Sequence, residues 1–365
     1  MTVIRNVIEA LEKKAPLSLQ ESYDNSGLSV GNVDTDVKGI LVSLDCTEEV
    51  IDEALSLNCN LIVTHHPLIF SPLKKITGSN YVEKCVIKAI QNNIAIYSSH
   101  TNLDNITTGV NGKIAEKLKL QEIKILRPAK GNLRKLVTYC PESHADLVRN
   151  AIFDAGAGQI GDYDHCSFNV TGEGSFRAGD KSNPFVGEKN KDHVEPEIRI
   201  ESIFHDFNES KIITDLINAH PYEEVAYDIY KLENTDHQHG IGMVGELENE
   251  ASLDTFLQTL KETFNTGVIR HTTTTKNKIK HVAVCGGSGS FLINEAIKSG
   301  ADIFVTSDLK YHQFFDADSK IVLADIGHFE SEQFTTELLV EYLKDIFTNF
   351  ATHFSGINTN PINYF

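Results

Sequence analysis

An internal repeat constrains the fold of this chain more than any other feature of its sequence. Residues 40–66 align without gaps with residues 282–308, and residues 94–104 align with residues 322–332. Each copy of the first block contains an apolar run typical of a strand, a segment with helical spacing and a second apolar run. This alternation predicts parallel βαβ units. The sequence therefore predicts an α/β core whose two halves arose by duplication.

A segment of different character separates the two halves. Residues 131–246 have the pattern strand, helix, strand, strand, helix, strand, which is the order of a ferredoxin-like α+β domain. We therefore predict a first core half at 1–130, an inserted domain at 131–246 and a second core half at 247–365. Within this frame, the polar stretches 178–194 and 272–278 are predicted to be loops.

Length, charge and cysteine usage exclude several classes of protein. The 365 residues exceed what one core normally holds, and the formal net charge of −18 argues against binding to nucleic acid. No apolar run is long enough to span a bilayer, and residues 2–19 have the spacing of an amphipathic helix rather than a signal peptide. The six cysteines form no C-x-x-C pair, so neither a disulfide framework nor a cysteine-based zinc site is expected. These features predict a soluble cytoplasmic protein that makes no membrane contact. Its partner is expected to be a small-molecule substrate or ligand.

Histidines and carboxylates follow three of the predicted strands. His65 and His66 come directly after one apolar run, and two further runs are each followed by one imidazole and one carboxylate. These four residues are His100, Asp104, His328 and Glu332. Ligands in open α/β sheets lie at the carboxyl ends of the strands, where these side chains should meet. Imidazole nitrogen and carboxylate oxygen without thiolate suit Zn²⁺, Fe²⁺ or Mn²⁺, and three of the histidines with the two acids could hold two ions.

Each of these pairs also has a plain structural interpretation. The adjacent histidines could be hydrogen-bonded within the fold, Asp104 could cap a turn, and Glu332 could be an ordinary acid in the first turn of a helix. For one pair alone, the structural interpretation is the better one. Three strand ends that carry the same chemistry favour a metal site instead.

Weaker candidates surround these residues. Gly286, Gly287 and Gly289 lie between a predicted strand and a predicted helix, where backbone N–H groups could bind an anion, although a tight packing turn explains them equally well. Asp45 follows the first strand of the repeat and is a candidate for orienting a metal ligand. Three further residues could line the same cavity: Asp308, Lys310 and His312. A turn or another structural role is expected for residues 24–27, His220 and residues 222–224.

Six motifs stand out along the two core halves. They are Y-D-N-S-G-L (23–28), V-T-H-H-P-L (63–68), S-H-T-N-L-D (99–104), G-G-x-G (286–289), V-T-S-D-L-K-Y-H (305–312) and I-G-H-F-E-S-E (326–332). Together they resemble the motifs of the Nif-three-like family, whose members are often labelled homologues of GTP cyclohydrolase I type 2. The Y-D-N motif departs mildly from the W-D-N of many relatives.

This resemblance implies a dinuclear metal centre whose ligands come from the matching motifs. The implied ligands are His65, His66, Asp104, His328 and Glu332. The resemblance also implies a toroidal homohexamer with metal sites facing an internal cavity, and a PII/CutA-like insert marked by H-P-Y-E-E-V-A-Y-D at 220–228. His100 matches His328 in the repeat but lies outside the usual ligand set of the family, so we expect it near the site.

Two hypotheses about function follow. In the first, the chain is a metal-dependent hydrolase of the cyclohydrolase type, in which two ions lower the pKa of a bound water and polarise the bond under attack. His100 or Asp45 would then move protons or orient ligands, and the substrate would be a nucleotide or a phosphoester. In the second, the ions stabilise a hexameric binding or regulatory assembly without turnover, and the insert senses a ligand or partner.

Overall fold

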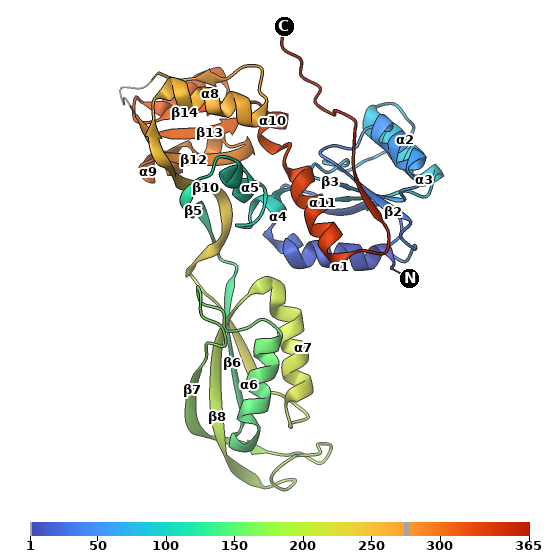
Figure 1. Ribbon diagram of the computed structural model, residues 1–365. Helices are drawn as coiled ribbons and strands as arrows, with labels where there is room; N and C mark the ends of the chain where they lie inside the picture. The colour runs from blue at the N-terminus through green and yellow to red at the C-terminus, as the bar shows by residue number, and fades with distance from the viewer. Residues whose placement is uncertain (1, 274–277) are drawn as a thin grey trace. The chain divides into compact units, whose positions relative to one another are not determined.

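The computed structural model describes residues 2–273 and 278–365, which fold into two compact units (Figure 1). One unit comprises Met1–Pro128 and Gln238–Phe365, and the other comprises Ala129–His237. The second unit ends earlier than the predicted boundary at 246 because strand β10 (Thr235–Ala251) already runs into the sheet of the first unit, where Met243 pairs with Val284. Within the predicted loop at 272–278, residues 274–277 lie outside the described residues.

The first half of the core is built on a five-stranded sheet in the order β1-β4-β3-β2-β15. Its strands are β1 (Gly27–Val30), β2 (Gly39–Ser43), β3 (Leu61–Thr64), β4 (Ala95–Ser98) and β15 (Ala351–Phe354). Every residue of β2, β3 and β4 is buried, as expected for a parallel sheet covered on both faces. The helices of this half are α1 (Ile4–Lys14), α2 (Glu48–Ser56), α3 (Tyr81–Gln91), α4 (Thr101–Asp104), α5 (Val110–Lys117) and α11 (Thr335–Ile346).

Local sequence explains why these helices begin and pack where they do. The Thr47 hydroxyl accepts a hydrogen bond from the Val50 N–H and so caps α2, while Asn80 caps α3 in the same way. The apolar faces of α2 and α3 pack with the sheet in one buried cluster that includes Val50, Ile51 and Val86. The resulting rigid layer fixes the carboxyl ends of β3 and β4.

The second half of the core repeats this design. Its six-stranded sheet has the order β11-β14-β13-β12-β10-β5. The elements are β5 (Gln121–Lys130), β10, α8 (Leu253–Phe264), β11 (Arg270–His271), β12 (Ile279–Ser288), α9 (Ile293–Lys298), β13 (Ile303–Ser307), β14 (Val322–Asp325) and α10 (His328–Glu332). Val42 pairs with Val63 in the first sheet, and Val284 pairs with Val305 in the second. These are the residues that the sequence repeat aligns, so the two halves share strand register as well as sequence.

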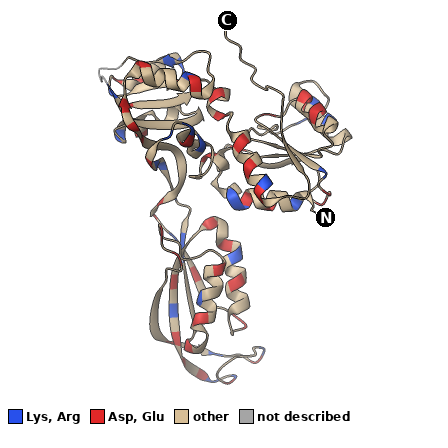
Figure 2. Cartoon of the chain, viewed as in Figure 1, with Lys and Arg blue, Asp and Glu red and all other residues tan. Residues whose placement is uncertain are grey.

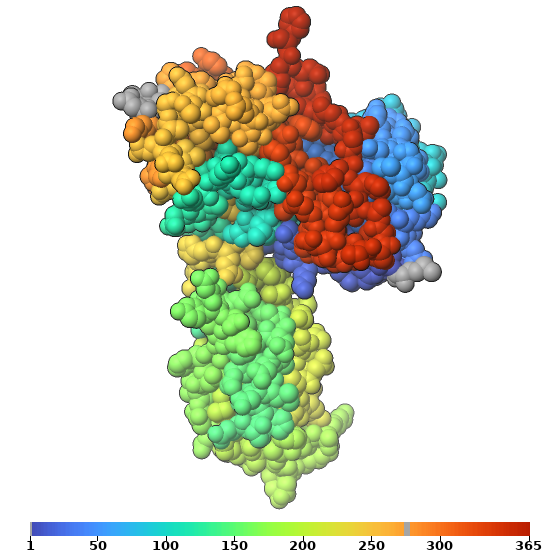
Figure 3. All heavy atoms as spheres, viewed as in Figure 1, coloured from blue at the N-terminus to red at the C-terminus, as the bar shows by residue number. Residues whose placement is uncertain are grey.

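The C-terminal segment departs from the repeat. Strand β15 adds to the first sheet in parallel with β2, beyond the last element that the repeat predicts. Figure 3 shows the dark red C-terminal residues between the orange second half and the blue first half of the core. Thr359 donates a hydrogen bond to Asp45 at 2.7 Å, and Asn360 donates one to Glu330 at 3.2 Å. The end of the chain therefore bonds to both halves.

The second unit has the predicted βαββαβ order. Its elements are β6 (Leu133–Pro141), α6 (Ala145–Asp154), β7 (Phe168–Arg177), β8 (Asp192–His205), α7 (Glu209–Ala219) and β9 (Tyr227–Lys231). The strands pair antiparallel in the order β7-β8-β6-β9, and the two helices share a buried cluster with β6 and β8. This strand order is that of a ferredoxin-like sheet, whereas the PII/CutA likeness of the insert stays a prediction.

The helices of the chain were compared with membrane-spanning helices, and their charged residues were located. No helix among the described residues is long and apolar enough to cross a membrane. Figure 2 shows acidic residues on helices of both units, and the formal net charge of the chain is −18.

Candidate metal centre

Four histidines from the two core halves converge on one place. His65 and His66 directly follow β3, His100 follows β4, and His328 begins α10. The ring centroid of His66 lies 5.0 Å from that of His65 and 5.1 Å from that of His328. The ring centroid of His100 lies 5.2 Å from that of His65. The site therefore forms at the carboxyl ends of parallel strands, where the sequence predicts it.

Each of these imidazoles is held through its Nδ1 atom by an oxygen at 2.7–2.8 Å. The partners are the Ser99 carbonyl for His65, Asp45 for His66, Asp24 for His100 and Asp308 for His328. A carbonyl oxygen can only accept a hydrogen bond, so Nδ1 of His65 carries a proton, and Nε2 is the ring atom left to bind a metal ion. Such outer partners fix the ring orientation of metal-binding histidines.

A first group of ligand atoms surrounds His65. Its Nε2 atom lies 3.8 Å from Asp104 Oδ1 and 3.7 Å from Glu332 Oε1, and all three side chains are almost fully buried. Among the described residues, neither His65 Nε2 nor Asp104 Oδ1 has a hydrogen-bond partner. Buried polar atoms are rarely left in this way, and the spacing is about that of two ligands of one metal ion. This gap fits an ion.

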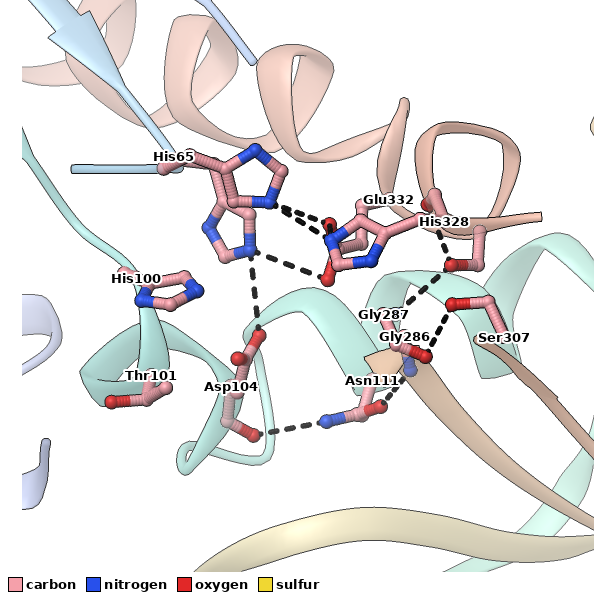
Figure 4. A network of polar contacts seen from close by, with 12 residues as sticks. His65, His100, Thr101, Asp104, Asn111, Gly286, Gly287, Ser307, His328 and Glu332 are labelled. Carbon is pink, nitrogen blue, oxygen red and sulfur yellow. Dashed lines mark hydrogen bonds and ion pairs between the residues drawn. The ribbon is translucent and has the colours of Figure 1, made fainter. Parts of the chain in front are cut away.

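A second group surrounds the other oxygen of Glu332. His66 Nε2 lies 2.9 Å from Glu332 Oε2 and 3.2 Å from His328 Nε2, which itself lies 3.1 Å from Glu332 Oε2. Two imidazole lone pairs that face each other at this distance repel, so a proton or a metal ion must lie between the two nitrogens. The three side chains have the spacing of a group that could hold a metal ion. Figure 4 shows His65, Asp104, His328 and Glu332 pointing toward one another.

The charges of the site are balanced by shifted pKa values. Burial, and after it the nearby charge of Glu332, raises the pKa of Asp104 to about 7. Burial alone would lower the pKa of His66, but its hydrogen bonds to Asp45 and Glu332 outweigh burial and raise the pKa to about 9. Burial would likewise lower the pKa of His328, but the charge of Glu332 and the hydrogen bond to Asp308 outweigh it and raise the pKa to about 11. Without metal, protons on these imidazoles therefore neutralise the buried carboxylates.

A cavity of about 560 Å³ opens onto the site. Aromatic rings from both core halves line it. Several of the histidines and carboxylates described above and three residues of the C-terminal segment complete the lining. The rings are Tyr23, Phe70, Phe291 and Phe329, and the C-terminal residues are Asn360, Pro361 and Ile362. A small organic molecule has room beside the histidines.

The structure thus brings together all five side chains that the family resemblance implies as ligands, and it places His100 beside them. Asp45 touches His66 and Asp308 touches His328, whereas Lys310 and His312 are exposed and do not line the cavity. Sequence reasoning missed Asp24, which reads as part of a turn. Its carboxylate accepts hydrogen bonds from His100 and from the backbone and hydroxyl of Thr101.

Two of the three glycines of the predicted anion loop, Gly286 and Gly287, use their N–H groups for other contacts. The N–H of Gly286 donates to Asn111 Oδ1 and the N–H of Gly287 donates to Ser331 Oγ, both at 2.9 Å, so neither is free to bind an anion. Gly287 has φ +60°, and a Cβ atom there would clash with Glu332 Oε1. The turn is one that packs tightly against the carboxylate, which is the alternative that the sequence left open.

Comparisons with known proteins agree with the motifs. The family model for Duf34/NIF3 (NGG1p interacting factor 3) matches residues 2–361. Two curated relatives, from Halalkalibacterium halodurans and Bacillus subtilis, are each called "GTP cyclohydrolase 1 type 2 homolog" and are 36% identical over 99% of this chain and 98% of theirs. A Bacillus cereus protein related to NIF3 has a solved structure that matches with a TM-score of 0.87 and 37% identity over 100% of this chain and 99% of its own. Staphylococcus aureus protein SA1388 matches with a TM-score of 0.78 and 30% identity over the same shares.

Proposed function

Because the chain belongs to the Duf34/NIF3 family, we propose that its core is a metal-dependent hydrolase with two divalent ions, Zn²⁺, Fe²⁺ or Mn²⁺. His65, Asp104 and Glu332 would hold one ion, and His66, His328 and Glu332 would hold the other, so Glu332 would serve both. Imidazole and carboxylate ligands without thiolate suit these three metals.

One observation carries this proposal. His65 Nε2 and Asp104 Oδ1 are buried, face each other at 3.8 Å and have no hydrogen-bond partner among the described residues. Leaving two such atoms unsatisfied costs several kcal/mol, on the order of 1–3 kcal/mol each. A bound metal ion would satisfy both atoms and remove this cost.

When bound, the ions would supply Lewis-acid activation of a water and of the bond under attack. The chain supplies the remaining functions. His100 is partly exposed to the cavity, and Asp24 holds its Nδ1 atom at 2.7 Å, so Nε2 is the atom that would give or take a proton. Asp45 and Asp308 orient the imidazoles of His66 and His328.

The cavity supports a substrate of nucleotide or phosphoester class. Its volume of about 560 Å³ and its aromatic lining suit a heterocyclic base, which stacks on such rings. The names of the relatives point in the same direction, toward a cyclohydrolase-like opening of a ring. An open cavity beside the ligands also favours turnover over the rival function of a purely structural metal assembly.

A turnover screen tests this proposal. The metal-stripped protein is reloaded separately with Zn²⁺, Fe²⁺ and Mn²⁺ and incubated with GTP, other nucleotides and phosphomonoesters, with products followed by liquid chromatography. We expect turnover in at least one combination, its loss in Glu332→Gln, and a fall of about 10²–10⁴-fold in His100→Gln with metal retained. Equal rates in wild type and Glu332→Gln would show that any activity arises elsewhere.

Assembly and location complete the proposal. The family resemblance supports a homohexamer, which light scattering would detect as six times the chain mass of 40.5 kDa. A cytoplasmic location is supported by the six cysteines, all of which are free in the structure.

A further inference from the structure

The inserted unit contains a pocket of its own, independent of the metal centre. Its volume is about 620 Å³. The walls are strand β7, the following loop at 178–185, strand β8 and the segment 222–226. The proposed hydrolase does not use any of these residues.

A buried carboxylate lies in the wall of this pocket. Glu197, on β8, is only 9% exposed although its neighbours Pro196 and Arg199 are exposed. Its Oε1 atom accepts a hydrogen bond of 2.8 Å from the Tyr222 hydroxyl. Among the described residues, no lysine, arginine or histidine forms an ion pair with it. Glu197 is thus a carboxylate that has lost most of its water without gaining a cationic partner.

Aromatic rings stand around this carboxylate. The ring centroids of Phe176 and Phe185 lie 6.3 and 6.2 Å from that of Tyr222, with the planes tilted by 58° and 49°. All three rings line the pocket, as does Tyr139. The rings thus form aromatic walls of one pocket, and proteins bind organic cations on the faces of such rings.

The remaining charges in the pocket also disfavour an anion. Its two arginines are already paired, Arg177 with Asp192 and Arg199 with Glu201. Three further glutamates line the pocket: Glu173, Glu223 and Glu224. The positive charges are therefore occupied by partners outside the pocket, whereas the deepest negative charge is not.

Two features of the sequence leave room for a ligand. Strand β7 carries Gly172 and Gly174 where larger side chains would fill the space, and a Cβ atom on Gly174 would clash with the Glu197 carboxylate. The loop after β7 is tied down across the pocket, because the Asn183 N–H donates to Glu223 Oε1 at 2.7 Å. The sequence alone favours a structural role for Tyr222, but here its hydroxyl also orients Glu197 toward the pocket.

We infer that the inserted unit binds a small organic cation, a protonated amine or amidine on an apolar body, with the charge on Glu197 and the body among Phe176, Phe185 and Tyr222. Such a ligand would complete the charge balance that Glu197 lacks and would cover the apolar walls. This ligand class for the inserted unit is independent of the metal chemistry proposed for the core.

Three probes with one shared phenyl ring test the inference on the full-length, metal-loaded protein at pH 7. Benzylamine is cationic, benzyl alcohol is neutral and benzoate is anionic, and binding is measured by ligand-observed NMR titration. We expect benzylamine to bind at least about tenfold more tightly than benzyl alcohol, and benzoate to bind most weakly. No binding of benzylamine, or equal binding of benzylamine and benzoate, would overturn the inference.

Two variants locate the site. Glu197→Gln keeps an acceptor for the Tyr222 hydroxyl and should abolish the preference for the cation, whereas Glu188→Gln, an equal charge change at an exposed residue outside the pocket, should not. Phe185→Leu changes a ring that is 51% exposed and therefore little needed for folding, and it should weaken benzylamine binding several-fold. A cation preference that survives Glu197→Gln would place the binding elsewhere, including at the metal centre, and would refute the assignment.

Discussion

His66 Nε2 and Glu332 Oε2 lie 2.9 Å apart although 266 residues separate them in the chain. The imidazole comes from the end of a strand in the first core half, and the carboxylate comes from α10 in the second. The inserted unit interrupts the sequence between them. The contact therefore joins the two duplicated halves at the atoms that would hold metal.

Replacing Glu332 by Gln should empty both metal positions. The amide keeps the size of the side chain but removes the negative charge that both ions would share, so zinc bound at saturation should fall from about two ions per chain to fewer than one. Glu330→Gln is the matched control, since Glu330 lies on the same helix, is also buried and bonds to Asn360 rather than to any of the proposed metal ligands. Zinc titration with a chromophoric chelator measures both variants. Equal zinc binding in the two variants would contradict the role of Glu332 at both ions.

Gly287→Ala should weaken metal binding, because the new methyl group would displace the Glu332 carboxylate. Gly287 and Gly300 both have positive φ, at +60° and +81°, so alanine strains both by about 1–2 kcal/mol. Only at Gly287 would the new methyl group clash with Glu332, whereas the space beside Gly300 is open. We expect Gly287→Ala to weaken zinc binding by at least about tenfold and Gly300→Ala to leave it unchanged. A comparable loss in both variants would assign the effect to backbone strain.

Asp45→Asn should weaken one metal position and spare the other. The carboxylate holds Nδ1 of His66 at 2.7 Å, and losing such an outer partner typically costs 10- to 100-fold in metal affinity, by an order-of-magnitude rule. Calorimetric titration should then resolve one tight and one weakened equivalent. Thr359→Val serves as the control, because it removes the other hydrogen bond of Asp45 without touching the imidazole. Retention of two equally tight equivalents in Asp45→Asn would rule out the orienting role.

Metal affinity should rise steeply between pH 7 and 9. In the metal-free protein the pKa of His66 is raised to about 9 and that of His328 to about 11, so both imidazoles hold protons at pH 7. An ion must displace these protons, and each displaced proton makes the affinity rise about tenfold per pH unit below the pKa concerned. Calorimetry in buffers of different ionisation heat counts the protons released, and we expect about two at pH 7. Binding that releases none would contradict these pKa shifts.

The sequence predicts the core of the site because its ligands are tied to local patterns. His65, His66 and His328 follow apolar strands or begin a helix, so their position at one edge of a sheet follows from the βαβ repeat. Residues that reach the site through tertiary contacts leave no such signal. Asp24 reads as a turn residue, and its bond to His100 exists only because β1 pairs with β4.

The C-terminal segment and the glycine turn show the same limit. The pairing of β15 with β2 brings Thr359 to Asp45, and no local pattern specifies a partner so far away in the chain. The sequence of Gly286–Gly289 suits both an anion loop and a tight turn, and only the bonds of its N–H groups to Asn111 and Ser331 decide between them.

Anomalous X-ray diffraction from crystals grown with Zn²⁺ tests the bridging arrangement most directly. We predict two peaks about 3.5–4 Å apart, one beside His65 and Asp104 and the other beside His66 and His328, with Glu332 beside both. A single peak, or no peak at these side chains in excess zinc, would contradict the two-metal centre on which the proposed hydrolase depends.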